Sequence, residues 1–87
     1  MAKNRTTVVN VRTSQYDVYI GRPSQWGNPF HIGRDGTRAE VIAKYRAYAR
    51  RFARSELAKL KGKRLGCYCH PLPCHGDVLA ELADSLS

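Results

Sequence analysis

The stretch RLGCYCHPLPCHGDVLAEL, residues 64–82, decides the fold predicted for this chain. Its first part, residues 64–69, follows a basic segment. It is short and largely apolar, which is typical of a β-strand. Pro71 and Pro73 then impose a stiff turn, because each proline ring fixes its own backbone torsion. A final helix follows, with apolar residues at helical spacing. This stripe consists of Val78, Leu79, Leu82 and Leu86.

Two further strands are predicted upstream, at residues 6–11 and 17–20, since both segments are short and rich in β-branched or aromatic residues. Residues 22–36 form a long loop dense in Gly, Pro, Ser and Asn. Thr37 and Glu40 have the spacing of a capping box, so a helix is expected to begin there. We expect this helix to reach Gly62, with an interruption or restart at Ser55.

This order of elements predicts a small α/β domain with three strands, at least partly parallel, one long crossover helix and a C-terminal helix. A right-handed crossover would make the second and third strands parallel neighbours. Residues 1–87 are expected to form one domain, with 1–5 as a disordered tail. Ligands of such sheets bind beyond the carboxyl ends of the strands. That edge would gather residues 21–22, the loop around Trp26 and residues 67–75.

The charge of the chain is concentrated in one segment. The formal net charge is +8, and residues 38–64 contain ten Lys and Arg against two Glu, so the rest of the chain is neutral overall. The positive electrostatic field of such a segment attracts polyanions, either nucleic acid or an acidic protein. A helix face that is simply exposed to solvent can have the same basic composition. The residues predicted to contact a polyanion are Lys44, Arg46, Arg50, Arg51 and Arg54.

No apolar run reaches the roughly 20 residues of a membrane span, and the N-terminus does not continue into the apolar part of a signal peptide. A cytoplasmic protein that does not enter membranes is therefore expected, as a monomer or a homodimer. A disulfide is not expected in a reducing cytoplasm.

All three cysteines and two of the three histidines lie within residues 67–75, and three interpretations remain open. The first is a structural zinc site, which would stabilise so small a domain. Its ligands would be Cys67, Cys69, Cys74 and His75, with His31 or His70 as the alternative fourth ligand. The second is a reactive site in which Cys74 is the nucleophile and His75 the acid–base group, both at a helix N-terminus. The third is that the cysteines are simply small core residues.

The loop RPSQWGNPF, residues 22–30, contains the only tryptophan. Trp26 could cover the core, as aromatic residues of small domains commonly do. The functional interpretation is that Trp26 stacks on a ring of a ligand while Arg22 holds a phosphate or carboxylate. Asn28 and Arg38 are further candidate ligand-binding residues.

These motifs resemble family 4326 of the domains of unknown function, small proteins of bacteria and of phages that infect actinobacteria. The resemblance covers residues 9–82 and is carried by VNVR (9–12), YIGRP (19–23), WGNPF (26–30), TR (37–38), Tyr45, CYC (67–69) and CH (74–75). It implies that the motif positions line one site: Arg22, Trp26, Asn28, Arg38, Cys67, Cys69, Cys74 and His75. Residues 64–82 also resemble part of family 488 of the same kind. The basic run at 49–55 departs from the pattern of family 4326.

Two functional hypotheses follow. The first is a small basic binding module, for which the resemblance allows a phage origin; if phage-encoded, it would act in the host cytoplasm. It would contact nucleic acid or an acidic host protein and carry structural zinc. The alternative is a small enzyme acting on a nucleotide-like or other phosphate-bearing ligand through Cys74 and His75.

Overall fold

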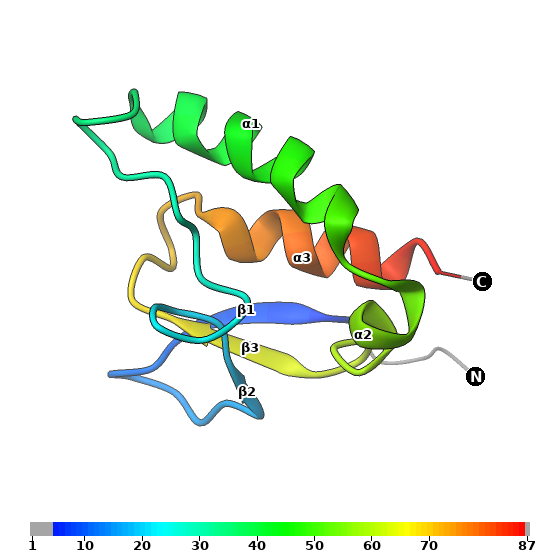
Figure 1. The fold of residues 1–87 in the computed structure, drawn as a ribbon. Helices are drawn as coiled ribbons and strands as arrows, with labels where there is room; N and C mark the ends of the chain where they lie inside the picture. The colour runs from blue at the N-terminus through cyan, green and yellow to red at the C-terminus, as the bar shows by residue number, and fades with distance from the viewer. Residues whose placement is uncertain (1–4, 87) are drawn as a thin grey trace.

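The structure of the protein is a computed structural model, and it describes residues 5–86. The predicted N-terminal tail, residues 1–5, lies outside the described residues except for Arg5. Figure 1 shows the elements in chain order. They are β1 (Thr7–Asn10), β2 (Val18–Tyr19), α1 (Arg38–Tyr48), a 3-10 turn (Ala49–Arg51), α2 (Arg54–Ala58), β3 (Arg64–Cys67) and α3 (His75–Asp84).

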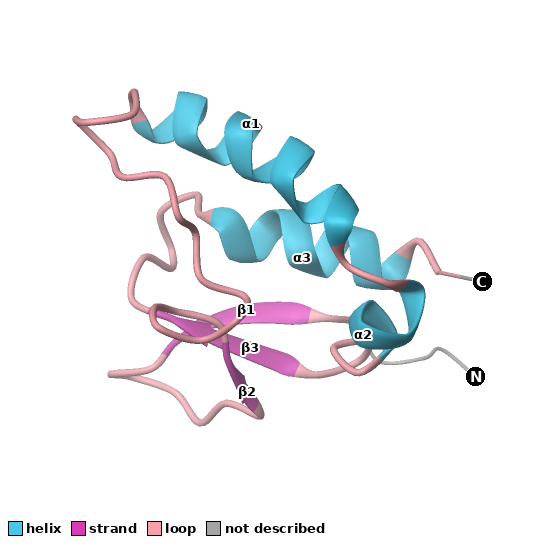
Figure 2. Cartoon of the chain, viewed as in Figure 1, coloured by secondary structure: helices cyan, strands magenta, loops and turns pink. Residues whose placement is uncertain are grey.

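The three strands form one parallel sheet in the order β1-β3-β2, seen in magenta in Figure 2. Gly66 of β3 is in register with Val9 on one side and Tyr19 on the other. The short β2 is held by Asp17, whose carboxylate accepts a 2.8 Å hydrogen bond from the backbone N–H of Arg64. The Arg64 guanidinium binds the same carboxylate. The predicted α/β class and the parallel pairing of the second and third strands are confirmed.

The third strand is shorter than predicted, because it ends at Cys67 and not at residue 69. Its partner β1 ends at Asn10. Beyond this point the Asn10 side chain, in place of the backbone of β1, binds the chain that follows β3. Its Nδ2 donates to the carbonyl oxygens of Tyr68 (3.3 Å) and His70 (2.9 Å). The chain therefore leaves the sheet after Cys67, and Cys69 lies in the turn that follows.

Both long helices lie on the same side of the sheet, with α3 between the sheet and α1 (Figure 1). Helix α3 approaches β1 closely because Gly76 has no side chain. A Cβ at this position would come within 2.7 Å of Ile20 Cδ1 and 3.1 Å of Val8 Cγ1. The start of α3 is thereby held against the carboxyl edge of the sheet.

The predicted long helix is broken before Ser55, which lies inside α2. The break is at Phe52, whose backbone is extended (φ −73°, ψ 132°). This turn brings the Phe52 ring against Trp26, with ring centroids 4.8 Å apart. Burial of the aromatic pair thus accounts for the break. Gly62 closes the segment as predicted, in the left-handed conformation that favours glycine (φ +76°).

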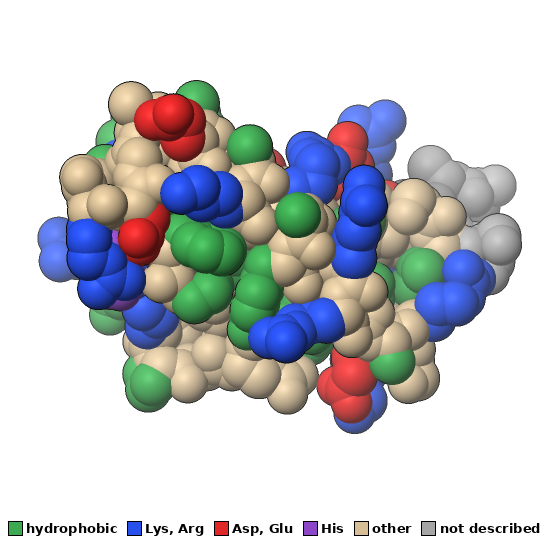
Figure 3. Space-filling view, turned by 45° about the horizontal axis from the view of Figure 1, so that its top comes forward, with side chains coloured by type: hydrophobic (Ala, Val, Ile, Leu, Met, Phe, Trp, Pro, Cys, Tyr) green, Lys and Arg blue, Asp and Glu red, His purple; other side chains and the backbone are tan. Residues whose placement is uncertain are grey.

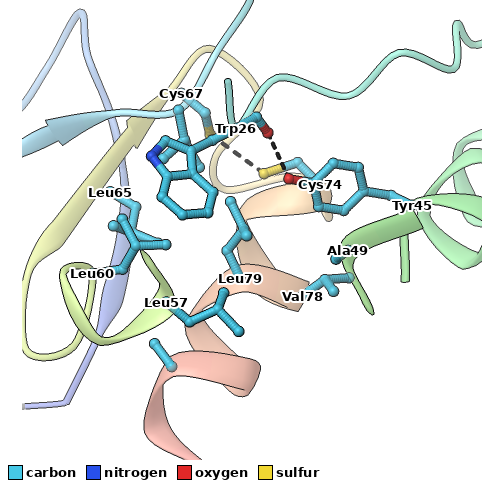
Figure 4. Close-up of a cluster of buried hydrophobic side chains, with 12 residues drawn as sticks. Trp26, Tyr45, Ala49, Leu57, Leu60, Leu65, Cys67, Cys74, Val78 and Leu79 are labelled. Carbon is cyan, nitrogen blue, oxygen red and sulfur yellow. Dashed lines mark hydrogen bonds between the residues drawn. The ribbon is translucent and has the colours of Figure 1, made fainter. Parts of the chain in front are cut away.

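One hydrophobic core joins the sheet, α3 and the inner face of α1 (Figure 4). Tyr45 of α1 is fully buried, and its hydroxyl donates a 2.6 Å hydrogen bond to the backbone carbonyl oxygen of Trp26. This bond ties the loop 22–36 to α1. Within residues 5–86, no helix is both long and apolar enough to cross a lipid bilayer.

Candidate ligand-binding pocket

A pocket of about 470 Å³ opens at the carboxyl edge of the sheet, where β2 and β3 end and where α1 and α3 begin. This is the edge at which the sequence predicts a site. Its lining combines two arginines and two histidines with apolar and sulfur-bearing side chains: Tyr19, Gly21, Arg22, Asn28, Phe30, His31, Ile32, Arg38, Val41, Ile42, Cys67, Tyr68, Cys69, Pro73, Cys74 and His75. The volume lies within the range of about 300–1,000 Å³ that is usual for small-molecule sites.

Two guanidinium groups face this pocket from different segments. Arg22 follows β2, and its Nη1 lies 2.8 and 2.9 Å from the two ring nitrogens of His31. Arg38 is the first residue of α1, and its Nη1 donates to the carbonyl oxygen of Pro73 at 3.0 Å. Neither arginine forms an ion pair with a carboxylate of residues 5–86. Since a guanidinium has five N–H donors, most of the donors of each are free for a ligand.

The loop that carries Arg22 is fixed by local hydrogen bonds. Asn28 Oδ1 accepts from the N–H of Phe30 at 2.9 Å, and its Nδ2 reaches the carbonyl oxygen of Val41 at 3.4 Å. Asn28 therefore both lines the pocket and joins the loop to α1. Helix α1 begins as predicted, because Thr37 and Glu40 form both bonds of a capping box.

Cys67 and Cys74 form a buried sulfur pair at the pocket, with their Sγ atoms 3.4 Å apart (Figure 4). Cys67 ends β3, while Cys74 is the N-cap of α3 and accepts the N–H of Gly76 at 3.3 Å. The hydrogen bond from the Cys74 thiol holds the pKa of Cys67 below its ordinary value, and burial only partly opposes this. The same bond and burial raise the pKa of Cys74. Within the pair, Cys67 is therefore the more acidic member.

His75 is buried beside this pair as the first residue of α3. Its Nε2 lies 2.7 Å from the carbonyl oxygen of Ile20, so this nitrogen carries the proton and donates. Burial lowers the pKa of His75, which keeps the ring neutral. In that tautomer the remaining nitrogen, Nδ1, holds the lone pair and is the basic atom of the ring.

The predicted zinc ligands are only partly brought together. The described residues contain no group of three or more His, Cys, Asp or Glu side chains placed to hold a metal ion. The sulfurs of Cys67 and Cys74 are adjacent, whereas the Nε2 of His75 faces the Ile20 carbonyl and the ring of His31 faces Arg22. As they stand, these side chains do not form a tetrahedral set.

Trp26 does not take part in the pocket, although the sequence places it among the candidate ligand-binding residues. It is 6% exposed and packs on Phe52 in the core. This position agrees with the packing interpretation of Trp26. The aromatic residues that do line the pocket are Tyr19, Phe30 and Tyr68. The sequence could have indicated Tyr19, two residues before Gly21, and Tyr68, next to Cys67, because both lie at the ends of predicted strands.

Three of the five predicted polyanion-binding residues make contacts within the described part of the chain. On the face drawn in Figure 3, Lys and Arg side chains lie in separate groups among hydrophobic and acidic ones. Lys44 donates to the carbonyl oxygen of Asp35, and Arg46 pairs with Glu81. Arg51 lies over the ring of Tyr48 at 4.6 Å. Among the described residues, Arg50 and Arg54 have no carboxylate partner.

The fold and the pocket together define a small α/β protein with a ligand-sized cavity at the carboxyl edge of a parallel sheet. The model of the family described as "Domain of unknown function (DUF4326)" matches residues 3–85, and the chain belongs to that family. The chain is also 41% identical over 86 residues to an uncharacterised 12.4 kDa protein of the nrdA-td intergenic region of Enterobacteria phage T4. That match covers 91% of this chain and 78% of the phage protein. No solved structure matches the chain.

Proposed function

We propose that this protein binds a small phosphate-bearing ligand of nucleotide size in the pocket at the carboxyl edge of its sheet. The observation that carries the proposal is the pair Arg22 and Arg38, which line one cavity without a carboxylate partner among residues 5–86. Elsewhere in the described chain, Arg34, Arg46 and Arg64 each pair with an acidic side chain, whereas Arg50 and Arg54 have no such partner and lie outside the cavity.

The charge of the lining supports an anionic ligand. The described residues that line the pocket include two arginines and no Asp or Glu. Arginine forms paired hydrogen bonds with phosphate and carboxylate oxygens, and these bonds are strongest where water is partly excluded. The starts of two helices, α1 and α3, lie at the same cavity and add to its positive potential.

The apolar part of the lining supports a ring next to the anionic group. Ile32 and Tyr68 line the pocket yet are 54% and 57% exposed, which is unusual for large hydrophobic residues. Phe30 contributes a further aromatic ring. Aromatic side chains stack on nucleobases irrespective of their sequence. A molecule that carries both a phosphate and a flat ring, such as a nucleotide, in which ribose connects the two, fits both parts of the pocket.

The proposal is tested by calorimetric titration of the protein with nucleoside monophosphates, ribose phosphate, inorganic phosphate and the corresponding nucleosides. A nucleoside monophosphate should bind more tightly than inorganic phosphate or the nucleoside alone. Arg22→Gln and Arg38→Gln should each weaken binding by about 10- to 100-fold, since a hydrogen bond to a charged group contributes about 1.5–3 kcal/mol. Arg50→Gln, outside the pocket, is the matched control and should bind normally. Equal affinity in all three variants would overturn the proposal.

Catalysis in the same pocket by Cys74 and His75 remains the alternative that would make the protein an enzyme. It is supported by the position of both residues in the lining and by the neutral His75 ring. Cys74→Ser retains a good N-cap for α3 and should abolish turnover of a bound ligand without unfolding the protein. Turnover that persists in this variant contradicts the assignment.

Binding of nucleic acid or of an acidic host protein remains a prediction from the net charge of +8. It is supported by Arg50 and Arg54, which have no carboxylate partner among residues 5–86. The affinity would then fall steeply with salt, and Arg50→Glu together with Arg54→Glu would weaken it for every sequence. Binding that is insensitive to salt and to these changes contradicts it.

Zinc binding by the cysteines likewise remains a prediction. To complete a set of four ligands, the His75 ring would have to leave the Ile20 carbonyl, or His31 would have to leave Arg22. Metal analysis of the purified protein would then find about one equivalent of zinc, and chelation would unfold the chain. A purified protein that contains no metal, and whose melting temperature is the same with and without a chelator, contradicts the zinc prediction.

A further inference from the structure

The sulfur pair has a property that ligand binding does not use. Cys67 and Cys74 have their Sγ atoms 3.4 Å apart, and a disulfide requires about 2.05 Å. The two atoms therefore need to approach each other by about 1.4 Å to form the bond. Within residues 5–86, no other two sulfur atoms lie within hydrogen-bond distance.

The pair is positioned by two different elements that are already packed together. Cys67 is the last residue of β3, and Cys74 precedes the first turn of α3. Helix α3 is fixed against the sheet through the close contact of Gly76 with Ile20 and Val8. Its N-cap is further held by Asp77, whose carboxylate accepts the N–H of Cys74 at 3.0 Å. The two sulfurs are thus kept side by side by the fold itself.

The pocket gives a small reagent access to this pair. Both cysteines are at most 4% exposed as residues, but both line the cavity at the carboxyl edge of the sheet. A molecule of the size of hydrogen peroxide can enter where a protein thiol cannot. Cys69, which is more exposed, has no sulfur neighbour within hydrogen-bond distance among the described residues.

We propose that Cys67 and Cys74 form an oxidation site, at which a peroxide converts the two thiols into an intramolecular disulfide. The Cys67 sulfur attacks one peroxide oxygen, the O–O bond breaks, and a sulfenic acid and one water are formed. The Cys74 sulfur, giving up its proton, then attacks the Cys67 sulfur and expels the sulfenic oxygen as a second water. Two thiols and one hydrogen peroxide thereby give one disulfide and two waters. A small dithiol reductant reverses the change.

The disulfide would alter the site in a defined way. Before oxidation, the lining of the pocket holds a pair of hydrogen-bonded cysteine sulfurs. Afterwards it holds a neutral disulfide, which joins the end of β3 to the start of α3 by a covalent bond. Oxidation therefore removes the ionisable sulfur from a pocket whose other charged groups are arginines. The oxidation itself is independent of which ligand the pocket binds.

The test counts thiols in the fully reduced protein before and after one equivalent of hydrogen peroxide. The count, measured with Ellman's reagent in denaturant, should fall from the three free cysteines to one. Peptide mapping should find residues 67 and 74 joined with the loss of two hydrogens, in a monomeric chain, and dithiothreitol should restore all three thiols. Cys69→Ser, the matched control, should form the same disulfide.

A second variant checks the order of the steps. In Cys74→Ser the disulfide cannot form, so the sulfenic acid should persist at residue 67 and be captured by dimedone. Serine is itself a favourable N-cap, so this variant retains the start of α3. Three thiols that survive peroxide in the wild-type chain, or a disulfide that uses Cys69, would overturn the proposal. Neither result depends on ligand binding, so the proposed function is tested separately.

Discussion

Replacing Tyr45 with phenylalanine removes a buried hydrogen bond that joins the loop 22–36 to α1. The Tyr45 hydroxyl donates to the Trp26 carbonyl oxygen at 2.6 Å, and the Tyr45 side chain is fully buried. Phenylalanine retains the ring contacts with His75 and Tyr48, whose centroids lie 5.0 and 5.7 Å away. The substitution therefore removes only the donor and leaves the carbonyl of a buried residue without a partner.

The loss should be about 1–3 kcal/mol in the free energy of unfolding, which is the usual cost of an unsatisfied buried polar group. For a domain of this size each kcal/mol lowers Tm by about 4–8 °C, so a clear shift is expected. Urea denaturation followed by circular dichroism measures the free energy, and a thermal scan gives Tm. Tyr48→Phe is the matched control, because Tyr48 is only partly buried and its hydroxyl forms no hydrogen bond within the described residues. Equal stability of the two variants would refute the reasoning.

Three further predictions concern the sheet edge and the pH dependence of stability. Gly76→Ala places a methyl group against Ile20 and Val8 and should cost about 1–3 kcal/mol by overpacking, measured by urea denaturation. Adding Ile20→Val should recover part of this loss, because it removes the Cδ1 atom that the new methyl group would meet. If the stability changes of the two single variants simply add in the double variant, this contact is not the cause of the loss. Because burial lowers the pKa of His75, the unfolded chain binds the proton more readily, so Tm should decline as the pH falls below about 6.5. His75→Gln should lose that decline, whereas a variant that keeps it would show that another group is responsible. Hydrogen bonds from Arg64 lower the pKa of Asp17 to about 2, so their stabilisation should be lost as the pH falls from about 4 towards 2. Asp17→Asn should flatten the acid side of the Tm profile, and an unchanged profile would exclude this ion pair as its cause.

Local signals in the sequence were sufficient for most of the fold. Thr37 and Glu40 predict the start of α1 because both capping bonds lie within four residues of chain. Gly62 predicts the end of the helical segment because its φ of +76° favours glycine. The parallel pairing of β2 with β3 follows from the length of the connection between them.

Other features depend on contacts between distant residues, which the sequence does not display. The helix breaks at Phe52 because that ring packs on Trp26, 26 residues upstream. The sequence leaves two interpretations of Trp26 open, and its burial is visible only in the folded core. Strand β3 ends at Cys67 because Asn10, on another strand, takes the next carbonyl groups.

The candidate site was predicted in its location more accurately than in its chemistry. Arg22, Arg38, Cys67 and Cys74 meet at the carboxyl edge, as the rule for parallel sheets requires. The sequence groups all three cysteines, but it could not indicate which two sulfurs are adjacent, because this depends on the path of the turn through Pro71 and Pro73. It places Cys74 at a helix N-terminus, but the capping role of its sulfur could not be predicted, since cysteine is not among the preferred capping residues.

The strand order has a consequence for how the chain acquires its structure. The central strand β3 is the last strand in the sequence, and it pairs with residues 57 positions earlier in β1 and 47 positions earlier in β2. During synthesis, β1 and β2 therefore have no sheet partner until residue 67 has left the ribosome. A fragment that stops before Arg64 would lack every strand pairing of the native sheet. The sheet must accordingly form late, together with the packing of α3 on the core and the closure of the pocket. All three events involve the same cysteine-rich turn between β3 and α3.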